Sequence, residues 1–140
     1  LGAALALLGA ALRVACFRAL GPLFTFELTI SPTHRLVTDG PYAWVRHPSY
    51  AGVYAVLLGA SAVMVAPGAW LREAWLAPSL VLGTVLAWVF VAFWTTKVVY
   101  ALRSTNRRLG TEDAELRRVF GAQWEDWAGR VPWRLVPWVF

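Results

Sequence analysis

The sequence predicts an all-α protein: a polytopic membrane helix bundle with a helical hairpin and a cytosolic C-terminal helical segment. The composition is 59% hydrophobic and 15% charged, whereas a soluble domain is about half apolar and about a quarter charged. Two windows, residues 48–71 and 74–96, contain no charged residue. Each is longer than the roughly 20 residues that a helix needs to cross the hydrocarbon core of a bilayer. A third apolar stretch covers most of residues 1–20.

The membrane-spanning helices are predicted over about residues 1–20, 48–67 and 74–102. The turn signals Gly21-Pro22 and Pro67-Gly68 end the first two of these helices. A proline at residue 48 suits the first turn of the second helix, because an N–H group there has no partner within the helix. We expect one domain, residues 1–140. We also expect this domain to be truncated at its N-terminus, because the chain begins with Leu rather than Met.

The C-terminal polar segment, residues 103–140, is predicted to contain an amphipathic helix over about residues 105–120. Thr111, which two acidic residues follow, is typical of a helix start, where acids favour the positive end of the helix dipole. Gly121 is predicted to end this helix. The tryptophans that follow, Trp127 among them, are expected to anchor the tail at the membrane interface.

The short link between the second and third spans makes them a hairpin, so both of its outer ends lie on one side of the membrane. Residues 23–47 and 103–140 are therefore expected to face each other there. Most arginines of the chain lie in these two segments, whereas the link carries only Arg72, beside Glu73. An excess of basic residues marks the cytosolic side. We therefore expect one composite site, facing the cytosol, built by two segments that are far apart in the sequence.

The net charge of +5 does not indicate nucleic acid as a partner. The basic residues flank apolar stretches, where they set topology and contact lipid headgroups, so membrane lipids are the expected partners. The single cysteine, Cys16, excludes an intrachain disulfide and a cysteine-based metal site. Neither His34 nor His47 is accompanied by a set of further metal ligands, and no metal is expected.

The polar run at residues 34–52 is the first candidate site. It collects histidine, arginine, aspartate and tyrosine side chains between apolar stretches, and polar groups near a bilayer are costly and tend to mark substrate paths. The free N–H groups at the start of the second helix, next to His47, can bind an anion or a nucleotide. The alternative is an interfacial loop in which Tyr42, Trp44 and Tyr50 are aromatic anchors.

The second candidate site is Arg108 together with Glu112, four residues later. This spacing is common for an exposed ion pair on a helix, which contributes only a few tenths of a kcal/mol. In the functional interpretation, Arg108 holds an anionic substrate through paired hydrogen bonds. Glu112 then binds a cofactor that carries a positive charge or hydroxyl groups. The residues alone leave both interpretations open.

Two blocks around the hairpin resemble the isoprenylcysteine carboxyl methyltransferases and, more broadly, the integral-membrane methyltransferases that include phospholipid methyltransferases. The first block runs from His34 to Gly52 and contains the sequence Arg46-His47-Pro48-Ser49-Tyr50. The second block runs from Arg108 to Leu116. The resemblance extends over roughly residues 30–137, and the order of the two blocks around one hairpin makes it specific.

The resemblance implies S-adenosylmethionine-dependent methylation of the C-terminal carboxylate of a prenylated cysteine. It also implies the endoplasmic reticulum membrane, with the active site toward the cytosol. Arg108 would bind the substrate and, with Glu112, would be catalytic. The implied cofactor contacts are His34, Arg35, Leu36, Val37, Tyr42, His47, Pro48, Ser49, Tyr50 and Glu112. The family tends to have glutamate at both positions 112 and 113, so Asp113 in this chain leaves the role of that position open.

Two other activities stay as alternatives. A phospholipid or other lipid methyltransferase would act on a lipid amine, and that reaction requires removal of a proton from an ammonium group. A fragment of an NADPH-dependent membrane sterol reductase would carry a similar Arg-His block and a tryptophan-rich tail. The pattern of Arg108, Glu112 and Leu116 favours a methyltransferase over the reductase. The long match through residues 108–132 favours the carboxyl methyltransferase over the amine methyltransferase.

Overall fold

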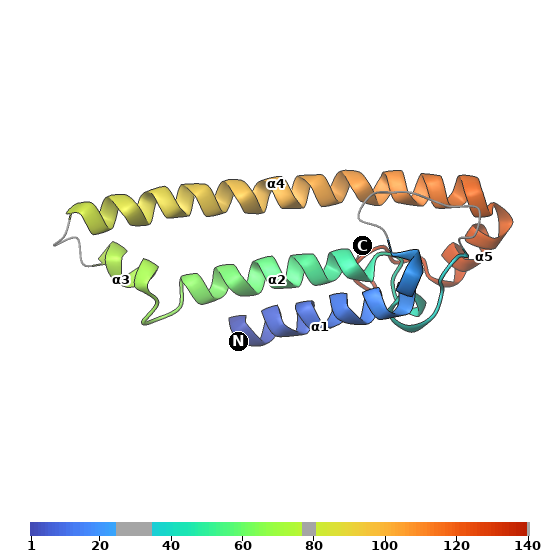
Figure 1. Ribbon diagram of the computed structural model, residues 1–140, viewed down its shortest axis with the longest axis horizontal. Coiled ribbons are helices and arrows are strands. Elements are labelled where there is room, and N and C mark those ends of the chain that lie inside the picture. The colour runs from blue at the N-terminus through green and yellow to red at the C-terminus, as the bar shows by residue number, and fades with distance from the viewer. Residues whose placement is uncertain (25–34, 77–80, 140) are drawn as a thin grey trace.

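The computed structural model describes residues 1–24, 35–76 and 81–139, and its regular elements in these ranges are all helices (Figure 1). Residues 2–130 of these ranges contain seven helical elements, two of them short 3-10 turns. They are α1 (Gly2–Leu20), η1 (Gly21–Leu23), η2 (Gly40–Ala43), α2 (Pro48–Met64), α3 (Trp70–Leu76), α4 (Val81–Phe120) and α5 (Ala122–Arg130). The predicted all-α class is confirmed.

Helices α1 and α2 pack against each other at backbone distance (Figure 1). A Cβ atom built at Gly59 of α2 would lie 2.5 Å from the backbone oxygen of Gly2 and 2.5 Å from the backbone nitrogen of Ala6. The second contact pairs Gly9 with Gly52, where added Cβ atoms would lie 2.7 Å from the opposite carbonyl oxygens. Small residues at such a contact let two apolar helices approach closely. This close contact fixes the position of α2 against α1.

Helix α4 is continuous over 40 residues, from Val81 to Phe120, so the prediction of a separate amphipathic helix was wrong. Thr111 does not begin a helix. Its hydroxyl group donates a hydrogen bond to the carbonyl oxygen of Arg107, 3.1 Å away, as a threonine inside a helix does. At 1.5 Å per residue α4 is about 60 Å long, about twice the thickness of a hydrocarbon core. The polar half of α4, from about residue 103, therefore extends beyond the length that a hydrocarbon core can cover.

The link between α2 and α4 also differs from the prediction. Residues 70–76 form the short helix α3, and the next described helix begins at Val81. Helix α2 ends at Met64, three residues before the predicted boundary. Gly68, with a φ angle of 79°, turns the chain, and its N–H donates to Glu73 Oε1 over 3.2 Å.

Two of the described helical stretches are long and apolar enough to cross a membrane, Gly2–Leu23 and the apolar part of Val81–Phe120. Helix α2 is also apolar but has 17 residues. It runs antiparallel to α4 and is joined to it by side-chain hydrogen bonds, one of them from Trp94 Nε1 to Ser61 Oγ at 3.0 Å. The predicted hairpin is thus formed by α2 and α4, and its outer ends meet.

The C-terminal tail returns to the start of α2. Gly121, with a φ angle of 49°, separates α4 from α5, as predicted. After α5, the carbonyl oxygens of Trp133 and Arg134 accept hydrogen bonds from the N–H groups of Arg46 and His47, at 2.9 and 2.8 Å. Trp127 was expected at the membrane interface, but it is buried and donates to the carbonyl oxygen of Tyr42 over 3.2 Å. The expectation that the two polar segments face each other is confirmed.

Candidate functional site

The first turn of α2 meets the polar half of α4 through a cluster of four side chains: His47, Tyr50, Glu112 and Asp113. The hydroxyl group of Tyr50 donates a short hydrogen bond to Glu112 Oε1. One turn further along α2, the Tyr54 hydroxyl donates to Asn106 Oδ1 over 3.0 Å. Positions 62 residues apart in the sequence are thus brought into contact. We call His47, Tyr50, Glu112 and Asp113 the α2–α4 cluster.

His47 lies between two carboxylates. Its Nε2 is 2.9 Å from Asp113 Oδ1 and its Nδ1 is 3.6 Å from Glu112 Oε2. Burial by itself would lower the pKa of His47, since the residue is only 5% exposed, but the hydrogen bonds to Asp113 and Glu112 outweigh burial and raise the pKa above its ordinary value. The ring is therefore an imidazolium held between two negative groups over a wider pH range than a free histidine.

Asp113 is the acid on which three cations converge. Its Oδ2 accepts from Arg46 Nη2 at 3.2 Å and lies 3.3 Å from Arg134 Nε, while Oδ1 faces His47. Burial would raise the pKa of this carboxyl group, but the His47 hydrogen bond and the charges of His47, Arg46 and Arg134 lower it instead. The sequence left the role of Asp113 open, and the structure makes it a link between three segments of the chain.

Arg46 connects the cluster to the C-terminal tail, a role that the sequence did not assign. Besides Asp113, its guanidinium donates to the carbonyl oxygens of Val131 and Pro132, at 3.3 and 3.0 Å. It also lies over the ring of Trp124, 5.7 Å from the ring centre. The signal in the sequence was the adjacent pair Arg46-His47, because two neighbouring cationic side chains in a buried segment require acids from elsewhere in the fold.

Arg108 lies on α4 one turn before Glu112, and its guanidinium interacts with the hydroxyl group of Tyr50. The side chain of Arg108 is exposed, whereas that of Glu112 is 23% exposed. Burial raises the pKa of the Tyr42 phenol, and the nearby carboxylate of Glu112 raises it further. The structure therefore brings together Tyr42, Tyr50, Arg108 and Glu112, four of the residues that the resemblance implies.

The start of α2 is less open to ligands than the sequence indicated. The N–H of His47 donates to the tail, and the N–H groups of Tyr50 and Ala51 donate to the carbonyl oxygen of His47, so few donors are left for an anion. Pro48 is fully buried. Ser49 accepts from Arg13 Nη1 of α1 at its carbonyl oxygen and its Oγ, both at 3.3 Å.

The upstream residues of the predicted site are placed differently. His34 lies outside the described residues. Arg35 is exposed, and Leu36 and Val37 are half-buried in the segment that precedes η2. None of these three residues has a hydrogen bond or ion pair to the α2–α4 cluster within the described part of the chain.

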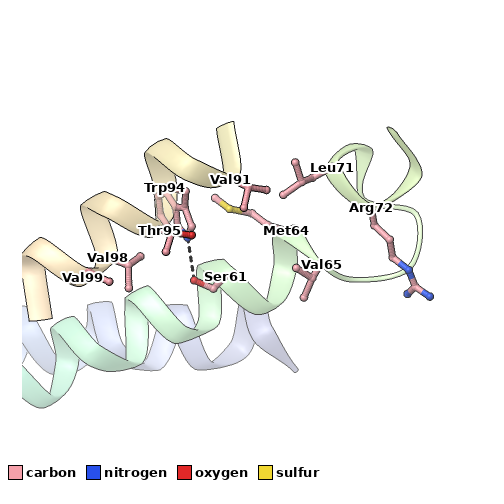
Figure 2. A pocket seen from close by; sticks show the side chains of 10 residues that line it. All are labelled: Ser61, Met64, Val65, Leu71, Arg72, Val91, Trp94, Thr95, Val98 and Val99. Atoms are coloured by element: carbon pink, nitrogen blue, oxygen red, sulfur yellow. Dashed lines mark hydrogen bonds between the residues drawn. The ribbon is translucent and has the colours of Figure 1, made fainter. Parts of the chain in front are cut away.

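An apolar groove of about 410 Å³ lies between α2, α3 and α4, toward the opposite end of the hairpin from the cluster (Figure 2). Figure 2 shows Met64 and Val91 pointing toward each other and Arg72 extending away from them. The lining residues are Ser61, Met64, Val65, Leu71, Arg72, Val91, Trp94, Thr95, Val98 and Val99. The groove and the α2–α4 cluster share the same two long helices. Val99 and Arg108 are nine residues apart on α4, which corresponds to about 14 Å.

Among the described residues, no group of three or more histidine, cysteine, aspartate or glutamate side chains is arranged to hold a metal ion. The polar atoms of the cluster are instead engaged with one another and with arginines. The arrangement provides a carboxylate, a phenol and an exposed guanidinium at the meeting point of two long helices. These groups can bind a ligand that has both hydroxyl groups and a carboxylate.

A comparison with protein families shows that this chain belongs to the isoprenylcysteine carboxyl methyltransferase family, whose model matches residues 2–118. The protein-S-isoprenylcysteine O-methyltransferase B of Arabidopsis thaliana is 29% identical over 133 residues, which are 94% of this chain and 55% of that protein. The protein-S-isoprenylcysteine O-methyltransferase of Schizosaccharomyces pombe is 32% identical over 99 residues, 71% of this chain and 32% of that protein. The chain thus spans about half, or less, of the length of these relatives.

Proposed function

We propose that this chain is the catalytic part of an S-adenosylmethionine-dependent O-methyltransferase that acts on the C-terminal carboxylate of a prenylated cysteine. The observation that carries the proposal is the contact between Tyr50 and Glu112, beside Arg108, in a chain of this family. It joins the two sequence blocks that carry the resemblance into one site. The relatives named above, whose names state this activity, support it.

The cluster fits the cofactor in its donor and acceptor groups. Glu112 is partly exposed and can accept hydrogen bonds from hydroxyl or ammonium groups, and the phenol groups of Tyr42 and Tyr50 lie near it. When bound, S-adenosylmethionine supplies an electrophilic methyl group on a sulfonium. We assign Arg35, Leu36, Val37, Tyr42, Pro48, Ser49, Tyr50 and Glu112 to its surroundings, as well as His34 and His47.

Arg108 is proposed to hold the substrate carboxylate. An α-carboxyl group has a pKa of about 3.5, so the carboxylate is already ionised at neutral pH and needs no general base. The residues then contribute by aligning the carboxylate and removing water from it. Arg46 and Arg134 contact Asp113, and Arg108 lies beside Tyr50; this gathering of arginines favours an anionic substrate. The methyl ester is neutral, so its attraction to Arg108 is lost and release is eased.

The apolar groove between α2, α3 and α4 is proposed to receive part of the prenyl group. It starts about 14 Å from Arg108 along α4, and apart from Ser61, Arg72 and Thr95 its lining is apolar. Burial of hydrocarbon contributes about 25 cal/mol per Å², so a chain lying along α2 and α4 adds affinity without polar contacts. The carboxylate stays at the polar end of the same helix pair.

The membrane arrangement is part of the proposal. Helices α1, α2 and α4 would span the membrane of the endoplasmic reticulum, in one domain over residues 1–140, with the α2–α4 cluster and the C-terminal segment facing the cytosol. The long, apolar helices support membrane association, and the clustering of arginines at the polar end supports the orientation. Membrane lipids are the expected neighbours.

Membership of the isoprenylcysteine carboxyl methyltransferase family favours a methyltransferase over the sterol reductase alternative. The lipid amine alternative is disfavoured by charge, because a substrate ammonium would approach an exposed guanidinium, Arg108, and further arginines behind it. Turnover of a farnesylcysteine analogue, compared with turnover of a lipid amine, distinguishes the two methylation reactions.

The test is turnover of a farnesylcysteine analogue by Arg108→Ala and Arg108→Lys, with Arg107→Ala as the matched control on the neighbouring, exposed position of α4. Loss of a charge-assisted contact costs on the order of 2–3 kcal/mol, so kcat/KM should fall roughly 30- to 150-fold in Arg108→Ala. Lysine cannot reproduce the planar two-point contact and should restore little. Near-normal turnover by Arg108→Ala would remove Arg108 from the substrate site.

A further inference from the structure

Asp113 has more connections than a surface acid needs. It is 6% exposed and takes contacts from Arg46 and His47, before α2, and from Arg134 in the tail. The backbone of the same segments is also paired, because the N–H groups of residues 46 and 47 donate to carbonyl oxygens of residues 133 and 134. The tail therefore lies against the start of α2, and one carboxylate joins both of them to α4.

The position of the His47 ring depends on this carboxylate. Both ring nitrogens face acids on adjacent positions of α4, Asp113 on one side and Glu112 on the other. The ring is 5.9 Å from the Tyr50 ring between centres, and Tyr50 itself holds the other oxygen of Glu112. The two carboxylate oxygens of Glu112 thus contact two partners, Tyr50 and His47, and Asp113 holds His47 in place.

Loss of the Asp113 charge would affect Glu112 through His47. The ring would keep Glu112, at 3.6 Å, as an acidic partner, and Arg46 and Arg134 would remain nearby without the negative charge of Asp113. A nearby positive charge favours the neutral imidazole. A neutral ring has no positive charge and one N–H donor instead of two, so its attraction to the Glu112 carboxylate weakens.

We propose that Asp113 is a positioning residue of the reaction: it holds the His47 ring against Glu112 and makes the C-terminal tail a required part of the site. This inference rests on the proposed function, because Glu112 matters as the group that faces the cofactor. His47 then acts on the cofactor site through its contact with Glu112. The role is distinct from packing, since it requires a negative charge at position 113 and a protonated ring at position 47.

The test uses Asp113→Asn, which keeps the shape of the side chain and removes its charge, and Asp126→Asn as the control. Asp126 is a well-exposed acid of α5 that pairs with Arg130 at 2.9 Å, so its change removes the same charge outside the cluster. Cofactor affinity, by calorimetry, should fall roughly 10- to 100-fold in Asp113→Asn, the range for a hydrogen bond to a charged group. It should stay within about twofold in Asp126→Asn.

The pH dependence separates positioning from packing. The chain has two histidines, so ¹⁵N-labelled histidine gives two imidazole signal sets, and His47→Gln assigns them. In the parent, His47 should keep its proton above its ordinary pKa of about 6.5 and lose it as pH rises through the higher folded value. In Asp113→Asn the titration, and with it the alkaline limb of kcat/KM, should move to lower pH. Asp113→Glu, which keeps the charge, should restore the parent titration.

The outcomes decide the proposal. An unchanged His47 titration in Asp113→Asn would overturn the proposal. An equal loss of cofactor affinity in Asp113→Asn and Asp126→Asn would also overturn it. If Asp113→Asn does not fold, the His47→Gln variant tests the proposal instead. An unchanged alkaline limb of kcat/KM in that variant would show that His47 does not position Glu112, and the proposal would be overturned. The imidazole titration does not depend on catalysis, so inactivity of the parent toward farnesylcysteine would count against the proposed function, while the titration still tests Asp113.

Discussion

Replacement of Tyr50 by phenylalanine separates the proposed site from the rest of the helix contact. Tyr50 and Tyr54 are one turn apart on α2, and each donates its hydroxyl proton to a side chain of α4, Glu112 and Asn106 respectively. Tyr50→Phe and Tyr54→Phe therefore delete the same atom from the same pair of helices. Only Tyr50 faces the group assigned to the cofactor.

The structure sets the size of the two effects. The partner of Tyr50 is a carboxylate, and a hydrogen bond to a charged group contributes about 1.5–3 kcal/mol. Because Glu112 is 23% exposed, water replaces part of this contact, and we expect about 1–2 kcal/mol, or roughly 5- to 30-fold weaker binding. The Tyr54 bond is neutral and exposed, so its loss should change binding by about twofold or less.

The assay is calorimetric titration of the detergent-solubilised chain with S-adenosylmethionine, together with thermal unfolding of each variant. Tyr50→Phe should weaken cofactor binding without a comparable fall in unfolding temperature. If Tyr54→Phe weakens binding as much as Tyr50→Phe does, the two hydroxyl groups only hold α2 against α4. The assignment of Tyr50 and Glu112 to the cofactor site would then be wrong.

Two further predictions concern the scaffold and its orientation. Gly59→Val should separate α1 from α2, because a Cβ atom at residue 59 would meet backbone atoms at 2.5 Å. We expect a loss of stability of more than about 2 kcal/mol, within the range for overpacking, and thermal unfolding measures it. Gly110→Ala is its control, since a Cβ atom at residue 110 meets nothing within 4 Å, so the change should stabilise α4 by about 0.5–1 kcal/mol; equal effects would refute the packing argument. Cysteines placed at Ala43 and Arg107, in a Cys16→Ala background, should both react with an impermeant thiol reagent from the cytosolic side, and labelling from opposite sides would contradict the proposed topology.

The helical class and the boundaries set by glycine and proline could be predicted from the sequence, because they depend on local signals. Gly21-Pro22 ends α1, Pro48 begins α2, and Gly121 ends α4. The break expected at Thr111 was wrong, because a threonine and two acids are tolerated inside a helix when the hydroxyl group has a carbonyl oxygen one turn back. A start signal inside an otherwise helical stretch does not interrupt the helix.

Part of the candidate site was also accessible from the sequence. The hairpin argument predicted that residues 23–47 and 103–140 would face each other, and the contact between His47 and Asp113 confirms that prediction. The identities of the cofactor contacts came from the resemblance, and they stay predictions. The placement of Arg35 on an exposed segment, without an ion pair to the cluster, was not indicated by any local pattern.

The sequence by itself determined that the chain is helical, apolar over most of its length and polar at one end, because hydropathy and turn residues act locally. Only the tertiary structure decided the roles of Arg46, His47 and Asp113. A buried charge is stable only if another charge compensates it, and the partners lie 66 and 67 residues apart in the sequence. Which acid meets which cation therefore depends on how α2, α4 and the tail pack, and that packing gives Asp113 its position at the centre of the cluster.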